Sequence, residues 1–331
     1  MKKVINDPLQ VVPDMFKGMS IAHPELECDL ETGTVFRRNK PANKVAVITG
    51  GGSGHEPAHG GYVGEGMLDA AVAGNVFASP SADKIYKAML KISAGRGIVQ
   101  IIKNYSGDVM NFGMAKDLAE LDGIRVEQII VKDDVATVDD DYTSGRRGIA
   151  GTVFIHKIVG AAAASGKDLD EVVRIGRRAV EGMRSVGFAL TPCSLPAADS
   201  ANFRLGDEEF EFGLGIHGEP GIERMPMKSA AELAALSVGR ILEDRPYAGK
   251  RTAVLINGLG STPLMEQYIF LAEVDAVLRR EGIAAERWYV GNYLTSFEMG
   301  GISTTLLEVD DELLGLLDYP CLTPAWKSIS K

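Results

Sequence analysis

The feature that most constrains the fold is an alternation of short apolar segments with amphipathic segments of helical period. Residues 44–49 (KVAVIT) are rich in β-branched side chains and run into the glycine-rich segment 50–54 (GGGSG), so we expect a buried strand that stops at a flexible loop. A helical pattern follows over 82–92, and the next apolar run, 97–105, is again typical of a strand. This order predicts right-handed βαβ units around a largely parallel sheet.

The alternation continues toward the end of the chain and predicts two α/β domains. Helical patterns cover 151–165 and 168–184, and we expect them to join the two halves; a further helix is expected over about 262–280. At about 150 residues per domain, a chain of 331 residues has room for two. We therefore predict an N-terminal domain over 1–184 with the glycine-rich loop and a C-terminal domain over 185–331. Each is expected to hold a largely parallel or mixed sheet flanked by helices.

The charge balance excludes several classes of partner. The chain has 35 basic and 45 acidic residues, a net charge of −10, so its surface repels phosphate backbones and anionic lipid. No apolar stretch reaches the roughly 18 residues of a membrane span, and no signal-type apolar segment follows the two N-terminal lysines. Cys28, Cys193 and Cys321 are far apart and odd in number, which suits a reducing compartment. We expect a cytoplasmic protein that binds neither nucleic acid nor membrane.

The glycine-rich segment 50–54 has two open interpretations. Its backbone N–H groups, free of Cβ obstruction, could hold a phosphate, or the loop could receive a polar ligand at close approach. It is not a P-loop, because the chain contains no GxxxxGK[ST] sequence. It is a poor dinucleotide fingerprint, because His55 stands where the third glycine would be required, so NAD binding is disfavoured.

Residues 55–59 (HEPAH) match the zinc-protease pattern HExxH letter by letter. That chemistry needs both histidines one turn apart on an established helix, but a glycine-rich segment precedes them here and Pro57 allows a first helical turn at most. We therefore expect no metal site. His55 is instead predicted to be a polar side chain delivered to the crevice at the strand end, with His59 behind it in a structural role.

Three other polar segments are candidates for chemistry. Lys103 and Asp108 follow the second predicted strand and should lie beside the glycine loop, where a carboxylate suits general-base work on a hydroxyl; a helix N-cap is the more ordinary role for Asp108. Arg146 and Arg147 could hold an anion, although a solvated pair is more ordinary. His217 has glycines nearby on both sides, which leave its imidazole open as a nucleophile toward a carbonyl carbon, although a lone histidine usually has no such role.

Six segments in chain order together resemble the substrate-binding K subunits of dihydroxyacetone kinases. They span nearly the whole chain: GGGSGHEP, IIKNYSGD, VKDDVA, GRRGIAGTV, FGLGIHGEPGI and NGLGSTPL. No single segment is specific, but the ordered set is. The resemblance implies a cytoplasmic phosphotransferase of glycerol metabolism that acts on dihydroxyacetone (glycerone), and it suggests a homodimer.

The resemblance also implies roles for individual residues. In that family a histidine adds through its imidazole to the ketone carbon of dihydroxyacetone and gives a covalent hemiaminal, and the GIHGEPG segment places that role on His217. The family's glycine-loop histidine and KNYxGD aspartate, which hold the substrate hydroxyls and act in acid/base transfer, match His55 and Asp108. The other implied substrate contacts are Gly52, Ser53, Gly54 and Lys103.

The resemblance further implies protein partners. Family members that use ATP carry an additional nucleotide-binding L domain after the K region, whereas this chain ends at Lys331. It is similar to the separate subunit of the phosphoenolpyruvate-dependent system. There an ADP-loaded L subunit, recharged by a phosphotransferase-system M protein, donates the phosphoryl group. ADP and magnesium are then expected on the L subunit, and no cofactor is expected on this chain.

Two alternatives to this function stay open. One is a paralogue that binds dihydroxyacetone but serves as a transcriptional coactivator, and the other is a kinase subunit for a related ketose such as erythrulose. The chain also departs from some relatives between Arg245 and Thr252, where they carry a longer insertion. That difference affects expected surface contacts with partners and leaves the pocket unchanged.

Overall fold

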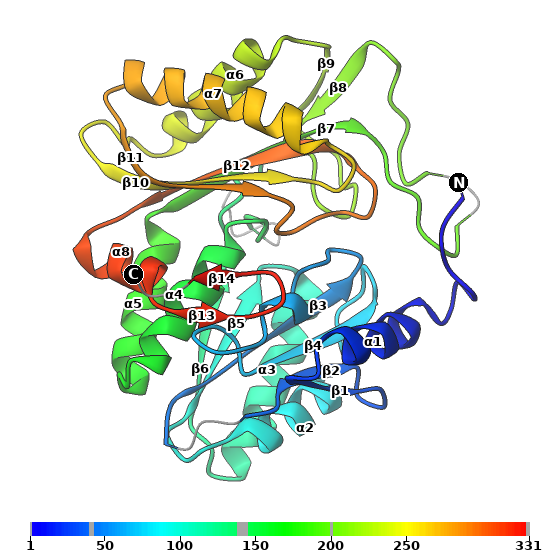
Figure 1. Cartoon of the computed structure of the whole chain (residues 1–331), viewed down its shortest axis with the longest axis vertical. Helices are drawn as coiled ribbons and strands as arrows, with labels where there is room; N and C mark the ends of the chain where they lie inside the picture. The colour runs from blue at the N-terminus through cyan, green and yellow to red at the C-terminus, as the bar shows by residue number, and fades with distance from the viewer. Residues whose placement is uncertain (1, 40–42, 138–144, 199–200, 329–331) are drawn as a thin grey trace.

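The computed structural model describes residues 2–39, 43–137, 145–198 and 201–328. Most of its strands form two six-stranded sheets stacked in separate layers, with helices outside and between them (Figure 1), and two short strands near residues 321–328 form a small third sheet. The two sheets confirm the predicted fold class, an α/β protein with mixed sheets flanked by helices. The predicted boundary after residue 184 stays a prediction.

The first sheet has the strand order β1-β2-β4-β3-β5-β6. Its strands, in chain order, are Leu26–Asp29, Thr34–Arg37, Ala46–Ser53, Ala70–Val76, Ile98–Lys103 and Val126–Val131. The strands β4, β3, β5 and β6 are parallel to one another, whereas β2 pairs antiparallel with β4 and β1 pairs antiparallel with β2. The predicted βαβ arrangement is therefore confirmed for the centre of this sheet.

Helices cover both faces of the first sheet. The helices α2 (Ala82–Ile92) and α3 (Ser106–Leu121) pack on the face that carries Ile98 and Ile102 of β5. The opposite face of β5, with Val99 and Ile101, packs against α4 (Thr152–Ala164) and α5 (Leu169–Glu181). Strands that are apolar on both faces are typical of a parallel sheet between helix layers.

The second sheet has the order β11-β10-β12-β7-β8-β9, and only its β10 and β11 pair in parallel. The helices α6 (Ala230–Asp244) and α7 (Leu264–Arg280) cover its outer face (Figure 1). Its strands, in chain order, are Met183–Thr191, Glu209–Phe212, Glu223–Pro226, Arg251–Gly258, Ala284–Gly291 and Gly300–Glu308. The other face of this sheet points toward α4, so one apolar core joins both layers.

The end of the chain returns to the first layer. The helix α8 (Asp311–Asp318) and the hairpin of β13 (Cys321–Leu322) and β14 (Lys327–Ser328) contribute side chains to the same core as α4. Backbone bonds of 3.2 and 3.0 Å join Glu65 and Leu322 in both directions. The short α1 (Val11–Ala22) lies over the strands at the other edge of this layer (Figure 1).

The glycine-rich segment differs from its prediction. The strand β3 does not stop at residue 49, because it continues through the glycines to Ser53. A Cβ on Gly52 would lie 2.7 Å from both Phe77 Cα and Ala78 N, so the backbone after β4 packs directly against this strand. Among the described residues, no helix has both the length and the apolar composition needed to cross a lipid bilayer.

Candidate functional site

The predicted site residues meet between the two layers, at the carboxyl ends of β3 and β5. His55 follows β3, Lys103 ends β5, and Asp108 lies in the first turn of α3. His217 comes from the loop between β8 and β9 in the second layer, yet its ring centroid is 4.9 Å from that of His55. The structure thus brings together residues from both halves of the chain, as a site at strand ends requires.

Three rings surround the imidazole of His217. Its ring centroid lies 4.9 Å from that of His55, 5.0 Å from that of Phe77 and 4.8 Å from that of Tyr105. His55 in turn stacks on Phe77 at 4.9 Å with an interplanar angle of 14°. Sequence reasoning missed both aromatic residues. Tyr105 lay within the KNYSGD segment already identified, whereas Phe77 is placed by the packing of its loop against Gly52 and had no sequence signal.

Glu219 fixes the orientation of the His217 ring. Its carboxylate accepts a hydrogen bond from His217 Nδ1 at 2.8 Å and another from the His217 backbone N–H at 2.9 Å. Burial alone would raise the pKa of Glu219, but these hydrogen bonds and the neighbouring imidazole lower it to about 2. A carboxylate can only accept, so Nδ1 carries a proton, and in the neutral form of the ring the lone pair is therefore on Nε2. The lone pair on Nε2 is the nucleophile that a carbonyl addition needs.

His55 is fully buried and has a defined tautomer. Its Nδ1 lies 2.7 Å from the backbone oxygen of Thr295, so Nδ1–H donates to that carbonyl. Burial, followed by the charge of Lys103 and then of His217, holds the pKa of His55 well below its usual value. Its Nε2 has no hydrogen-bond partner among the described residues. His55 is therefore a neutral base with one bare nitrogen.

Lys103 and Asp108 are both buried at this site, with exposures of 1% and 4%. Lys103 Nζ and Asp108 Oδ1 have no hydrogen-bond partner within the described parts of the chain. Burial raises the pKa of Asp108, and the nearby Lys103 charge opposes that rise. Burial lowers the pKa of Lys103, opposed by Asp108 and Glu219. Buried polar atoms without partners are costly, so the arrangement favours a ligand that supplies both donors and acceptors.

Asp108 does not have the N-cap role that its sequence position suggested. The helix α3 begins at Ser106 with Tyr105 at the cap position, and no side chain makes a capping hydrogen bond. Asp108 therefore lies inside the first turn. The N-cap hypothesis is wrong, because the helix starts earlier than its apolar periodicity indicated.

The structure shows how the residues of the glycine-rich segment are held in place. Ser53 Oγ donates a hydrogen bond of 2.8 Å to the Gly74 carbonyl, which ties β3 to β4. Gly54 has φ of +103°, and its N–H lies 3.1 Å from the Glu56 carboxylate. The segment is thus a rigid edge of the site. The roles of Gly52, Ser53 and Gly54 as substrate contacts stay predictions.

The HEPAH segment does not have zinc-protease geometry. Residues 55–59 form turns, so His55 and His59 are not one helical turn apart. His59 Nδ1 lies 2.9 Å from Nε2 of His156, on α4, and both rings are buried. Over the described ranges, no group of three or more His, Cys, Asp or Glu side chains could hold a metal ion.

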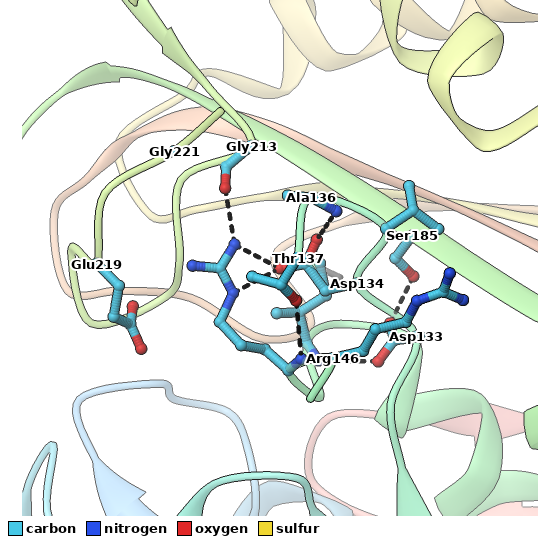
Figure 2. Close-up of polar contacts among 12 residues, drawn as sticks. Asp133, Asp134, Ala136, Thr137, Arg146, Ser185, Gly213, Glu219 and Gly221 are labelled. Atoms are coloured by element: carbon cyan, nitrogen blue, oxygen red, sulfur yellow. Dashed lines mark hydrogen bonds and ion pairs between the residues drawn. The ribbon is translucent and has the colours of Figure 1, made fainter. Parts of the chain in front are cut away.

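A second polar cluster supports the loop that carries His217. Arg147 donates to Asp134 Oδ2 through Nε at 2.8 Å and to the Gly213 carbonyl through Nη2 at 2.7 Å. Figure 2 shows Asp134 and Gly213 in this cluster, with Glu219 on the neighbouring loop. A Cβ on Gly215 would collide with both Arg147 Nη1 and Glu219 Oε2. Arg147 therefore packs against the loop that holds the nucleophile.

Asp133 connects the two layers next to this cluster. Its carboxylate accepts hydrogen bonds from the backbone N–H groups of Ile149 and Gly151 at 2.9 and 3.0 Å. It accepts another from Ser185 Oγ at 2.5 Å (Figure 2). Ser185 lies on β7 of the second sheet.

The two arginines of the GRRG segment have a different role from the one we expected. Arg146 is paired with Asp244, and Arg147 is 8% exposed and paired with Asp134. The two arginines are therefore neither a solvated pair nor an anion site, because a carboxylate of this chain neutralises each of them. Asp244 is 98 positions from Arg146, and Asp134 is 13 positions from Arg147.

The chain is similar to known proteins over nearly its whole length. The Dak1 domain matches residues 17–325. The chain is 47% identical over 329 residues to the "PTS-dependent dihydroxyacetone kinase 1, dihydroxyacetone-binding subunit DhaK" of Listeria innocua, with 98% of this chain and 100% of that protein covered.

Two solved structures are also similar. The "Dihydroxyacetone kinase operon co-activator Dha-DhaQ" superposes with a TM-score of 0.92 at 38% identity, covering 96% of this chain and 98% of that one. The dihydroxyacetone kinase of C. freundii in complex with AMP-PNP and Mg²⁺ gives a TM-score of 0.91 at 37% identity, over 99% of this chain and 61% of that one. Matches of this extent and identity show that the chain belongs to the Dak1 domain family.

Proposed function

We propose that this chain is the dihydroxyacetone-binding subunit of a phosphoenolpyruvate-dependent dihydroxyacetone kinase. The observation that carries the proposal is the state of His217, whose Nδ1–H is held by Glu219 at 2.8 Å while Nε2 is left as a nucleophile among three rings. Membership of the Dak1 domain family and the identity to a dihydroxyacetone-binding subunit support it.

Covalent capture of the ketone begins at His217 Nε2. Its lone pair forms a bond to the carbonyl carbon, and the π electrons of the C=O bond move to the oxygen, which takes up a proton. The oxygen takes its proton from solvent, and the ring regains neutrality by releasing its Nδ1 proton to solvent along the hydrogen bond to Glu219, whose side chain is 33% exposed. The hemiaminal has then gained one proton at oxygen and lost one at nitrogen. One covalent bond fixes a small triose that makes few other contacts, and glycerol, without a carbonyl, is rejected.

Phosphoryl transfer then needs a base at the substrate hydroxyl. Asp108 and His55 are the candidates, since each is buried and has an atom without a hydrogen-bond partner in the described chain: Asp108 Oδ1 and His55 Nε2. A neutral histidine with a bare nitrogen can accept the hydroxyl proton, and Asp108 can hold the same hydroxyl in line. Lys103 Nζ, which is buried without a hydrogen-bond partner in the described chain, can donate to a substrate oxygen. Transfer itself is mostly positioning and charge stabilisation.

The proposed partners follow from the same assignment. An ADP-loaded L subunit would donate the phosphoryl group and carry the magnesium, and a phosphotransferase-system M protein would recharge it. The structure of a relative that is longer than this chain was solved with AMP-PNP and Mg²⁺, which supports a nucleotide-binding partner. We further propose a homodimer that works in the cytoplasm.

The test of covalent capture uses dihydroxyacetone labelled with ¹³C at its ketone carbon. With the wild-type chain we expect a protein-bound tetrahedral carbon signal that weakens as the pH falls, because protonation removes the Nε2 lone pair. The His217→Ala variant should give no such signal, and labelled glycerol should give none with either protein. A bound ligand that stays planar at the carbonyl, or an adduct that persists in His217→Ala, contradicts the proposal.

A transcriptional coactivator is the second candidate function. The similarity to the co-activator structure at 38% identity favours it, and sensing would use the same pocket. Addition of the purified L and M proteins with phosphoenolpyruvate separates the two functions. A kinase subunit turns over a ketose, whereas a coactivator forms the adduct without turnover. A panel including erythrulose identifies the preferred ketose in the same assay.

A further inference from the structure

The segment 295–297, between β11 and β12, binds the loop that carries His55. The backbone N–H of Thr295 donates to the His55 carbonyl at 3.1 Å, and the Thr295 carbonyl accepts from His55 Nδ1 at 2.7 Å. Two residues later, the backbone N–H of Phe297 donates to the Gly54 carbonyl at 2.8 Å. A segment of the second layer therefore holds the end of β3 at two successive residues.

Ser296, the central residue of the same segment, binds the other histidine loop. Its Oγ donates a hydrogen bond of 2.6 Å to the carbonyl of Ile216, the residue directly before His217. The side chain is fully buried, so this bond is shielded from water. Three successive residues thus contact the carriers of both histidines.

Asn257, at the end of β10, fixes the start of this segment. Its Oδ1 accepts hydrogen bonds from the backbone N–H groups of Tyr293 and Leu294 at 2.8 and 2.9 Å. Its Nδ2 donates to the Leu294 carbonyl at 2.8 Å and to Ser303 Oγ at 3.0 Å. A buried amide with all of its bonds made has one low-energy geometry. The NGLGSTPL segment, which Asn257 opens, therefore anchors the backbone that leads into Ser296.

We propose that Ser296 is a positioning residue that fixes the nucleophile, His217, relative to the base, His55. This inference rests on the proposed function. A ketose bound at His217 Nε2 has to present its hydroxyl to His55 or Asp108, so the spacing of the two loops decides whether the hydroxyl proton can be removed. Glu219 orients the His217 ring from within the same loop, whereas Ser296 ties that loop to the segment that also holds His55.

The His217 loop keeps other supports when the Ser296 hydroxyl is removed. Asn202 Nδ2 donates to the His217 carbonyl at 3.1 Å, and Asn202 Oδ1 accepts from the Cys193 backbone N–H at 3.2 Å. Glu219 still binds the His217 ring at 2.8 Å. The nucleophile therefore stays available in a Ser296→Ala variant, and what is lost is the tie between its loop and the segment that binds His55.

The test measures adduct formation and phosphoryl transfer separately on the full-length chain. In Ser296→Ala, the affinity for ¹³C-labelled dihydroxyacetone should stay within about threefold of wild type. The rate of transfer in a single turnover, with excess L subunit charged by the M protein, should fall about tenfold or more, because a misplaced reacting group lowers the rate more than it lowers binding. A merely structural role would lower the stability of Ser296→Ala and leave the transfer rate of the folded protein unchanged.

The matched control is Thr252→Val. Thr252 is also fully buried in the second layer, where its Oγ1 donates to the Ala284 carbonyl at 3.1 Å. It lies at the start of β10, at the opposite end of the strand from Asn257. The control loses the same kind of hydrogen bond away from the site, so both the adduct and the transfer rate should match wild type. Urea denaturation of both variants compares their losses of stability.

Three results would overturn the inference. The first is a wild-type transfer rate in Ser296→Ala. The second is an equal fall of the rate in Thr252→Val, because the effect then comes from general destabilisation. The third is a parallel loss of adduct and transfer in Ser296→Ala, because the hydroxyl then supports the nucleophile alone and not its spacing from the base. Failure of the proposed function itself looks different: the wild-type chain would then form no adduct, or would not be turned over with the L subunit.

Discussion

Two buried polar regions of this protein differ in how completely their groups are paired. Around Arg147, the cation, the carboxylate of Asp134 and the Gly213 carbonyl all make hydrogen bonds of ordinary length. Around Asp108, by contrast, Lys103 Nζ and His55 Nε2 have no hydrogen-bond partner among the described residues. Both regions lie between the two layers, so burial alone does not distinguish them.

This difference distinguishes a region that supports the fold from a region that binds a ligand. A fully paired buried network has one low-energy geometry and holds the backbone that it touches, here the loop that carries His217. A network with unpaired donors and acceptors is poised to gain when a ligand supplies the missing bonds. Substitutions should therefore have opposite consequences in the two regions.

The largest effect is expected at Arg147. Arg147→Met leaves the buried Asp134 carboxylate without its cation, and breaking a buried pair in this way costs about 3–5 kcal/mol of unfolding free energy. Urea denaturation measures it. An Arg147→Met, Asp134→Leu double variant, which removes both charges, should recover much of the loss. Equal losses in the single and double variants would mean that the loss does not come from the unpaired Asp134 carboxylate.

An intermediate effect is expected at Glu219. Removing its carboxylate by Glu219→Ala takes away a charge-assisted hydrogen bond worth about 1.5–3 kcal/mol, so adduct formation should weaken at least about tenfold. Glu219→Gln keeps an acceptor oxygen and should weaken it less. The ¹³C adduct signal, titrated with dihydroxyacetone, measures both variants. Wild-type affinity in Glu219→Ala would show that the ring needs no orienting partner.

The smallest effect, and one of opposite sign, is expected at Lys103. Lys103→Met replaces an unpaired buried ammonium with an apolar chain of similar volume, so the ligand-free protein should gain about 1 kcal/mol of unfolding free energy. Ketose affinity should fall in the same variant. A loss of stability comparable to that of Arg147→Met would remove the distinction between the two regions.

The same variant changes the pH dependence through Asp108. Because burial raises the pKa of Asp108 above its unfolded value, the folded state holds the proton over a wider pH range, and stability falls as pH rises from the unfolded to the folded pKa. Lys103 opposes the rise, so Lys103→Met should extend this window to higher pH. Carboxyl NMR of Asp108 in both proteins measures the shift. Asp108→Asn should abolish this part of the pH dependence.

The apolar periodicity of single segments predicted those strands and helices that depend on one segment alone. The strands β3 and β5 and the helix α2 were predicted from apolar periodicity, whereas α1, β1, β2 and β4 were not predicted. The rule that parallel strands end together predicted that Lys103, at the end of β5, lies beside the glycine-rich segment. Those predictions are confirmed. The position of His217 in the same site came only with the family resemblance, since nothing local joins its loop to β3.

The residues that were missed depend on long-range packing. Phe77 reaches the site because its loop packs on Gly52, and Arg147 is buried because Asp134 and the Gly213 carbonyl come from separate segments. The strand β3 continues through its glycines because they pair with β4. A glycine-rich sequence taken alone predicts a flexible loop and gives no sign of this pairing. Partners that lie far away in sequence leave no signal in a single segment.

The bond from His55 Nδ1 to the Thr295 carbonyl has a consequence for the order in which the protein becomes active during synthesis. The two residues are 240 positions apart, and Thr295 also returns a backbone bond of 3.1 Å to the His55 carbonyl. A nascent chain that has exposed the first layer already contains His55, Lys103 and Asp108, but His55 still lacks the acceptor that sets its tautomer. His55 therefore acquires its defined tautomer only after the segment that contains Thr295 has been synthesised and has folded against the first layer.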